Sequence, residues 1–175
     1  MKRVTKILII LTVLLLCLGI AGIVYAVRAR LVSNEYQFQV DAVLAAASVA
    51  NGGEVSTDPL KAVWTEYAGR QAIVAPGNYK ALSYYLRSDA MMPPFGRIRE
   101  EKCLKITVCD EAVFWVMPLS ESGDSILIRL TTQGQTFLMR ARGGNLWPNL
   151  LECALNGTYR DRNIVPGEEN RGTAD

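Results

Sequence analysis

Three cysteines outside the N-terminal segment carry the side chains best suited to redox or nucleophilic chemistry: Cys103, Cys109 and Cys153. Cys103 and Cys109 bracket the stretch CLKITVC, in which apolar and polar residues alternate as in one β-strand. Such a strand separates their Cα atoms by about 20 Å, whereas a disulfide requires Cα atoms within about 7 Å. These two cysteines are therefore not expected to bridge one another.

Cys153, on a predicted C-terminal helix, leaves two interpretations open. In an oxidising compartment it could form one disulfide, with Cys109 or with Cys103. Alternatively, all three thiols stay free and buried and act as small apolar side chains. The chain has no C-x-x-C pair, which argues against a thioredoxin-like site.

The sequence contains no histidine, which excludes Ser-His-Asp and Cys-His catalytic pairs and histidine-ligated zinc. It also lacks a glycine-rich phosphate loop and a calcium loop. We therefore expect no catalytic, metal-binding or cofactor-binding residues. An enzyme that uses its thiols or its carboxylates is only the third hypothesis for function.

Two further groups of residues are candidates for binding. Arg129, Arg140 and Arg142 share the more polar face of a predicted hairpin, where they form either an anion-binding face or an ordinary solvated one. The segment DAMMPPFG cannot be regular structure, because two consecutive prolines remove two N–H donors. Its apolar side chains either pack against the core or form an exposed interaction loop; they are Met91, Met92 and Phe95.

Residues 7–27 contain no charge, and as a helix they span about 30 Å, the thickness of a hydrocarbon core. They predict a single transmembrane helix that follows a cytoplasmic stub, residues 1–6. The basic residues before this segment outnumber those after it, which favours a cytoplasmic N-terminus and an extracytoplasmic domain. The alternative is a signal peptide cleaved after Ala26, which would release a secreted protein.

The net charge of +2 comes from 19 basic and 17 acidic residues. They form no basic stripe of the kind that binds nucleic acid, so nucleic acid is not expected as a partner.

Residues 28–52 are expected to continue the helix beyond the membrane, because apolar residues recur there at helical spacing. The turn Asn51-Gly52-Gly53 should end it. The apolar stripe is expected to pack on the protein's own domain, with a partner's helix as the alternative. Its members are Tyr36, Val40, Val43, Ala47 and Ala50.

Residues 53–157 are predicted to form the α+β domain, and residues 158–175 a disordered tail. Pro59 suits the first position of a helix, and the apolar residues up to Ala68 share one helical face. A short strand at 71–75 follows. Two more helices are expected, at 78–86 and 148–155.

From residue 98 onward apolar residues alternate, which predicts a four-stranded antiparallel meander with strands at 98–109, 112–118, 125–132 and 135–142. A turn at Asp110-Glu111 would pair Val108 with Val113, Ile106 with Trp115 and Leu104 with Met117. A turn at Gln133-Gly134 would pair Leu130 with Phe137, Ile128 with Met139 and Ile126 with Ala141.

Together these elements predict an α+β protein: an N-terminal transmembrane helix, then a small domain of three or four helices packed on a curved four-stranded meander. The element order is similar in outline to the cone-shaped nuclear-transport-factor-like fold, and less closely to PAS/Cache-like sensor domains. This similarity concerns the order of elements alone and implies no function.

The expected function is that of a membrane-anchored protein-interaction domain, an accessory or assembly subunit of an envelope, secretion or transfer complex. The alternative is a small-molecule-binding sensory module, which the long juxtamembrane helix and a set of aromatic residues suggest. The aromatic residues are Trp64, Tyr67, Tyr79, Tyr84, Tyr85 and Trp115.

Overall fold

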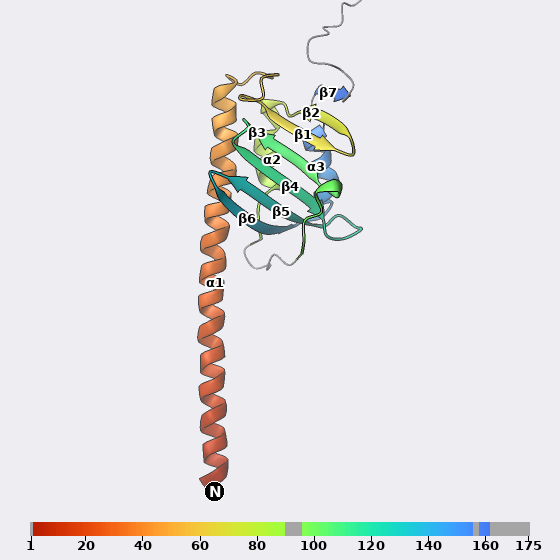
Figure 1. Ribbon diagram of the computed structural model, residues 1–175. Coiled ribbons are helices and arrows are strands. Elements are labelled where there is room, and N and C mark those ends of the chain that lie inside the picture. Colours follow the sequence, from red (N-terminus) through yellow and green to blue (C-terminus); the bar gives the residue numbers. More distant parts are fainter. Residues whose placement is uncertain (1, 90–95, 156–157, 162–175) are drawn as a thin grey trace, which may run out of the picture.

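The computed structural model describes residues 2–89, 96–155 and 158–161 (Figure 1). One long helix, α1 (Lys2–Ala50), precedes a small α+β domain. The domain lies beside the C-terminal half of α1, and the N-terminal half projects away from it (Figure 1). The predicted α+β class with a long apolar N-terminal helix is thereby confirmed.

Helix α1 runs without a break from the apolar segment into the domain, and it is the one described helix long and apolar enough to cross a membrane. It ends where the sequence predicted. Gly52 and Gly53 adopt φ of 63° and 79°, which glycine reaches without the steric cost other residues incur. The N–H of Gly53 donates to the carbonyl of Ser48, which caps one of the last carbonyls of the helix.

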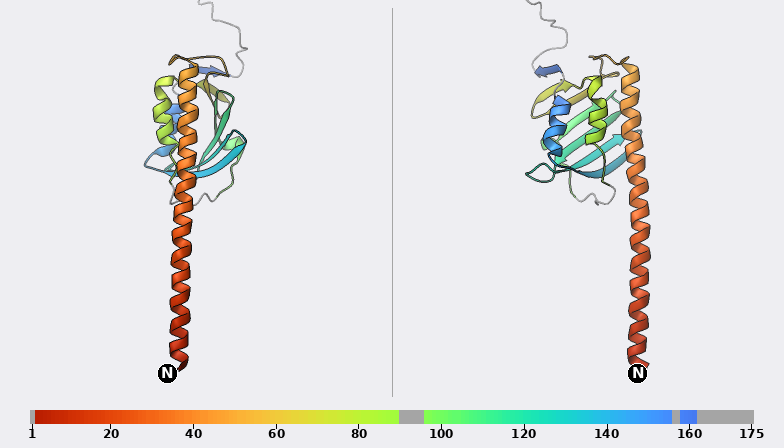
Figure 2. Two further views of the ribbon diagram at one scale, coloured as in Figure 1. Left: turned by 90° about the vertical axis from the view of Figure 1, so that its left-hand side faces the viewer. Right: turned by 180° about the vertical axis from the view of Figure 1, so that it is seen from behind.

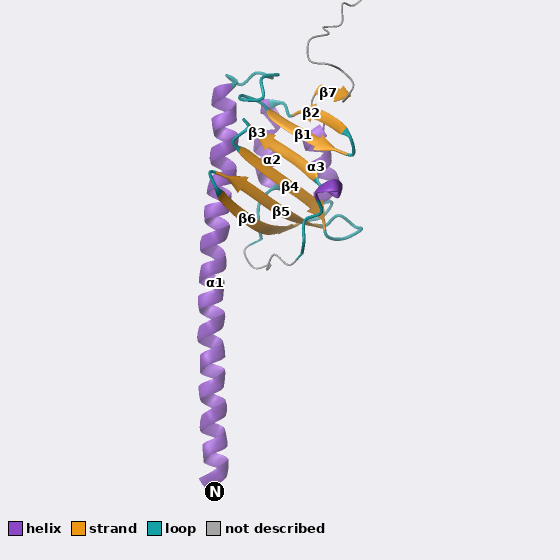
Figure 3. Ribbon diagram, viewed as in Figure 1, coloured by secondary structure: helices purple, strands orange, loops and turns teal. Residues whose placement is uncertain are grey.

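The sheet is antiparallel throughout and has the strand order β6-β5-β4-β3-β1-β2-β7 (Figure 3). Three strands of the predicted meander have the expected bounds, and the first is shorter than expected. The seven strands are β1 (Val63–Tyr67), β2 (Arg70–Ile73), β3 (Leu104–Val108), β4 (Ala112–Pro118), β5 (Ser125–Thr132), β6 (Gln135–Arg142) and β7 (Thr158–Asp161).

The predicted helix from Pro59 to Ala68 is wrong, because this stretch contains β1 and begins a hairpin with β2. A short apolar run fits a helix and a strand equally well. Two features favour the strand: Ala68 and Gly69 adopt φ of 50° and 81°, as a tight two-residue hairpin turn requires, and β1 pairs with β3 along its other edge. The sheet is therefore larger than the four-stranded meander.

The first four residues of the predicted tail form a strand. Residues 158–161 form β7, which pairs with β2, so the prediction of disorder is wrong for these four residues. Residues 162–175 lie outside the described part of the chain.

The first hairpin of the meander is one residue out of the predicted register. Its loop includes Cys109, which with Asp110 adopts φ of 51° and 57°, so Val108 pairs with Ala112 instead of Val113. A shift of one residue exchanges the two faces of a strand. In β4 the core side chains are consequently Ala112, Phe114 and Val116, whereas Trp115 and Met117 lie on the opposite face.

The second hairpin has the predicted register, with Leu130 opposite Phe137, Ile128 opposite Met139 and Ile126 opposite Ala141. Gln133 and Gly134 form its turn with φ of 47° and 75°, as a type I′ turn requires.

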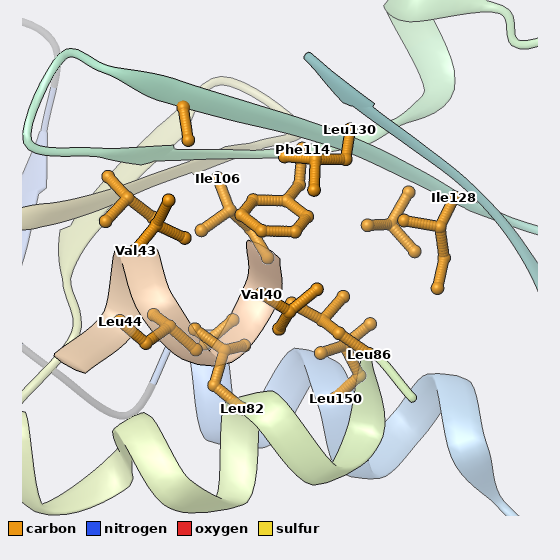
Figure 4. Packing of buried hydrophobic residues seen from close by; sticks show 14 of the residues in the cluster. Val40, Val43, Leu44, Leu82, Leu86, Ile106, Phe114, Ile128, Leu130 and Leu150 are labelled. Atoms are coloured by element: carbon orange, nitrogen blue, oxygen red, sulfur yellow. The ribbon is translucent and has the colours of Figure 1, made fainter. Parts of the chain in front are cut away.

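One face of the sheet is covered by α1, α2 (Tyr79–Tyr85) and α3 (Leu146–Leu155), so the domain has two short helices where more were expected (Figure 2). The core lies between these helices and the sheet, where Phe114 lies among side chains from both layers (Figure 4). The stripe of α1 packs on the protein's own domain, as expected, except that Ala50 is exposed and Leu44 joins the core. The buried residues of α1 are Ser33, Tyr36, Val40, Val43, Leu44 and Ala47.

Tyr36 ties α1 to the domain by a polar contact inside this core. Its ring is fully buried, and its hydroxyl donates a hydrogen bond of 2.8 Å to the carbonyl of Leu86, just after α2. Burial raises the pKa of Tyr36, so the hydroxyl stays protonated and remains a donor at any physiological pH.

Candidate functional site on the outer face of the sheet

The candidate site is the outer face of the sheet, which we define as the face away from α1, α2 and α3. Figure 1 looks onto this face, and the view from behind in Figure 2 shows the helices on the other side. Strand side chains alternate between faces, so the register that turns Phe114 inward turns Trp115 outward.

A row of side chains crosses the outer face at the level of Trp115. The strand pairing aligns Glu66 with Lys105, Lys105 with Trp115, Trp115 with Arg129 and Arg129 with Leu138. Directly opposite residues of neighbouring strands lie close enough for their side chains to interact. The row therefore forms one continuous strip from β1 to β6.

Two cations flank the indole ring of Trp115. The Lys105 Nζ lies 5.4 Å from the ring centroid and the Arg129 Cζ lies 5.5 Å from it, both within the range of cation–π attraction. Arg129 also forms an ion pair with Glu100, which belongs to the short 3-10 helix η2 (Glu100–Lys102). The half-exposed indole is thus held between groups that limit its rotation while leaving part of its surface accessible.

The segment that leads into η2 covers part of the outer face. Gly96 approaches β5 so closely that a Cβ atom on it would lie 3.0 Å from the Leu127 Cδ2, and its φ of 142° also favours glycine. Leu127 is consequently fully buried although it points to the outer face. Two open hollows of about 1040 and 350 Å³ lie beside η2 and share Glu100 and Glu101 in their linings.

The three predicted anion-binding arginines share this face but do not form one cluster. Arg129 is engaged by Glu100, whereas Arg140 is half-buried, pairs with Leu127, and has no hydrogen-bond partner on its Nε within the described part of the chain. Arg142 pairs with Ser125, four residues along β5 from Arg129, or about 13 Å. Binding of an anion by all three together is therefore not favoured by their spacing.

All four cysteines, each within the described residues, are free thiols, so neither the Cys109–Cys153 nor the Cys103–Cys153 bridge is formed. The thiol of Cys103 donates to the carbonyl of Arg99 at 3.0 Å, and that of Cys153 lies 3.6 Å from the carbonyl of Asn78. Burial raises the pKa of Cys103, Cys109 and Cys153. A raised pKa reduces the thiolate fraction, which is the opposite of what a nucleophilic cysteine needs.

The other sequence candidates are scattered. Met91, Met92 and Phe95 lie outside the described residues. The six aromatic residues do not surround one cavity, because Tyr79 is buried in the core whereas Trp115 lies on the outer face. In the part of the chain that the structure describes, no group of histidine, cysteine or acidic side chains could hold a metal ion.

Sequence reasoning missed the Trp115 row, because the assumed two-residue turn directed Trp115 into the core. The charged residues at the neighbouring outward positions, Lys105 and Arg129, were the available signal. No protein-family model matches the chain, and comparisons with curated proteins and with solved structures return no match. The interpretation of this face therefore depends on its geometry alone.

Proposed function

We propose that this chain is a single-pass membrane protein whose extracytoplasmic domain binds another protein through the outer face of its sheet. The partner is a component of the same membrane, in an envelope, secretion or transfer complex. The observation that carries the proposal is the half-buried Trp115 held between Lys105 and Arg129 on the sheet face opposite to α1, α2 and α3.

Helix α1 supports the membrane anchor. Its large apolar side chains from Ile7 to Val27 are all more than half exposed, and such a surface is stable in a hydrocarbon environment and unfavourable in water. The segment carries no charge, whereas basic residues precede and follow it.

The row at Trp115 supports a protein partner. Tryptophan and arginine are the side chains that most often dominate the binding energy of protein interfaces. A side chain already held in place loses less conformational entropy when it binds. The cation–π and ion-pair contacts of Trp115, Arg129 and Glu100 hold this strip in one arrangement before any partner arrives.

A non-enzymatic role is supported by the chemistry at hand. The sequence has no histidine, and burial raises the pKa of the three thiols in the domain.

The alternative of a small-molecule sensor is favoured by the 1040 Å³ hollow, but its lining carries four basic and two acidic side chains. Small-molecule pockets are mostly apolar, so we prefer the protein-binding role.

The protein-binding proposal predicts a crosslinking pattern in cells. A photo-crosslinking amino acid at Thr136, an exposed position whose partner in β5 is Thr131 on the outer face, should yield one discrete adduct. The same residue at Lys80, exposed at the start of α2, should yield none. Trp115→Ala should reduce the Thr136 adduct at least fivefold without changing the amount of protein. An adduct that is unchanged in Trp115→Ala would contradict the proposal.

The anchor predicts that residues 7–27 stay attached to the mature domain. Mass spectrometry of the purified protein should recover residues that precede Ala26, and the protein should stay with the membranes after extraction at alkaline pH. Cleavage after Ala26 with release into the soluble fraction would instead establish the secreted alternative. A carboxyl-terminal tag keeps both forms detectable in one experiment.

A further inference from the structure

Helix α1 determines which end of the domain lies closest to the membrane, because α1 and α2 are joined along their length by polar contacts and run antiparallel. The Asn51 side chain donates to the Tyr79 hydroxyl at one end, and the Ser33 and Ser88 hydroxyls lie 2.6 Å apart at the other. Further contacts follow the same order. They are Gln37 with Ser83, Asp41 with Ser83, and Tyr36 with Leu86.

The end at Ser88 is the one close to the bilayer. Ser33 lies six residues after Val27, the last of the uncharged run, on the same continuous helix, which amounts to about 9 Å along the axis. The headgroup layer extends roughly 5–8 Å beyond each side of the hydrocarbon core. The Ser33–Ser88 contact therefore lies just outside the headgroups, within reach of long side chains.

Edge strand β6 is at this same end. It is the strand of the sheet nearest the N-terminal half of α1 (Figures 1 and 2). The N–H of Asp89 donates to the carbonyl of Arg140 at 2.7 Å, which joins the residues after α2 to the end of β6. The exposed side chain of Arg142 follows two residues later.

An open hollow of about 570 Å³ lies between the end of α2, the end of β6 and the start of α3. Two exposed guanidinium groups, of Arg87 and Arg142, belong to its lining together with the acidic residue Asp89 and with Ser88, Gly143 and Gly144. The lining also contains Tyr84, 69% exposed, whose ring makes an edge contact with that of Tyr85 at 5.6 Å.

We propose that this hollow binds the phosphate-containing headgroup of an anionic phospholipid from the bilayer that anchors the chain. Arg87 and Arg142 contact the phosphate oxygens, whereas Tyr84 lies farther from the bilayer than Ser88 and borders the hollow on its distal side. The inference rests on the proposed membrane anchor and adds a ligand class to it.

The side chains around this hollow are suited to binding a phospholipid headgroup. Arginine presents paired N–H donors that match a phosphate. Arg28 and Arg30 lie on α1 between the apolar segment and the Ser33 contact. Acidic side chains lie at this end as well, among them Glu35, Asp89, Glu121 and Asp124. Arg87 and Arg142 are the basic residues that line the hollow itself.

The test uses the full chain reconstituted into lipid nanodiscs, with hydrogen–deuterium exchange measured by mass spectrometry. One set of discs contains phosphatidylcholine only, and the other contains about 30% phosphatidylglycerol. Peptides that cover residues 82–89 and 140–146 should exchange several-fold more slowly in the anionic discs. Each basic residue near an anionic surface is expected to strengthen binding about fivefold, so Arg87→Gln with Arg142→Gln should abolish the difference.

The matched control removes two charges at the opposite end of the domain. Lys61→Gln with Lys80→Gln changes exposed residues, and this variant should keep the slower exchange. Equal exchange of the wild-type chain in both kinds of disc would overturn the lipid proposal and leave the anchor intact. Slower exchange in phosphatidylcholine discs on addition of inorganic phosphate or glycerol phosphate would overturn it too, in favour of a soluble ligand. Failure of the chain to enter either disc would contradict the anchor and the lipid proposal together.

Discussion

A chain that begins at Gly53 is expected not to fold, whereas a chain that begins at Arg28 is expected to fold and to remain soluble. The reason is that the C-terminal half of α1 forms one side of the hydrophobic core. Tyr36, Val40 and Leu44 are buried to 97% or more against the domain, and each large apolar side chain contributes about 1.5–3 kcal/mol when buried.

Removal of α1 also exposes apolar side chains of the domain that the helix covers. Leu82 and Leu86 of the neighbouring helical segment are fully buried in the intact domain, and the hydrogen bond from Tyr36 to Leu86 would be lost. The loss of the three α1 side chains alone, about 5–9 kcal/mol, is comparable with the whole stability of a small domain, about 5–15 kcal/mol.

Circular dichroism and thermal melting of the two chains would decide this prediction. The longer chain should melt cooperatively and give dispersed amide signals in NMR spectra, and the shorter chain should do neither. A cooperative transition in the shorter chain, within a few degrees of the longer one, would show that the helix is an attachment and not part of the core.

Phe114→Ala is expected to destabilise the domain by about 3–5 kcal/mol, whereas Trp115→Ala, at the adjacent position, should cost about 1–2 kcal/mol. Phe114 is fully buried between β4 and the helices, so its removal leaves a cavity in a closely packed interior. Trp115 is half-buried on the outer face, so its removal leaves no enclosed cavity, although its contacts with Lys105 and Arg129 are lost.

The pair of variants tests the register directly, because the two-residue turn expected from the sequence would reverse the order of the two effects. Urea unfolding of the chain that begins at Arg28 measures both changes in the free energy of unfolding under the same conditions. Phe114→Leu serves as the control, since it keeps most of the buried volume and should recover more than half of the loss. A larger loss for Trp115→Ala than for Phe114→Ala would refute the register.

The second hairpin was predictable because its information is local. Gln133-Gly134 is flanked by alternating apolar residues on both sides, and one turn type satisfies every pair from Leu130–Phe137 to Ile126–Ala141. The end of α1 at Asn51-Gly52-Gly53 was predictable for the same reason.

The errors arose where distant contacts decided the structure. Residues 63–67 fit helical spacing, but the edge of β3, about forty residues later in the chain, pairs with them as a strand. The first hairpin depended on Cys109 adopting a positive φ, which is uncommon for a residue other than glycine, asparagine or aspartate. That one residue moved Trp115 from the expected core to the candidate binding face.

The absence of any linker between the apolar segment and the domain has a geometric consequence. Because α1 is continuous from Lys2 to Ala50 and its second half is part of the core, an anchored domain could not tumble independently of its helix. The outer face is parallel to the axis of α1 (Figure 1). In an anchored chain it would therefore be perpendicular to the bilayer and would face neighbouring proteins in the same membrane. A partner would then be found by a two-dimensional search among proteins standing at the same height, where confinement raises the effective concentration and even a weak contact can be well occupied.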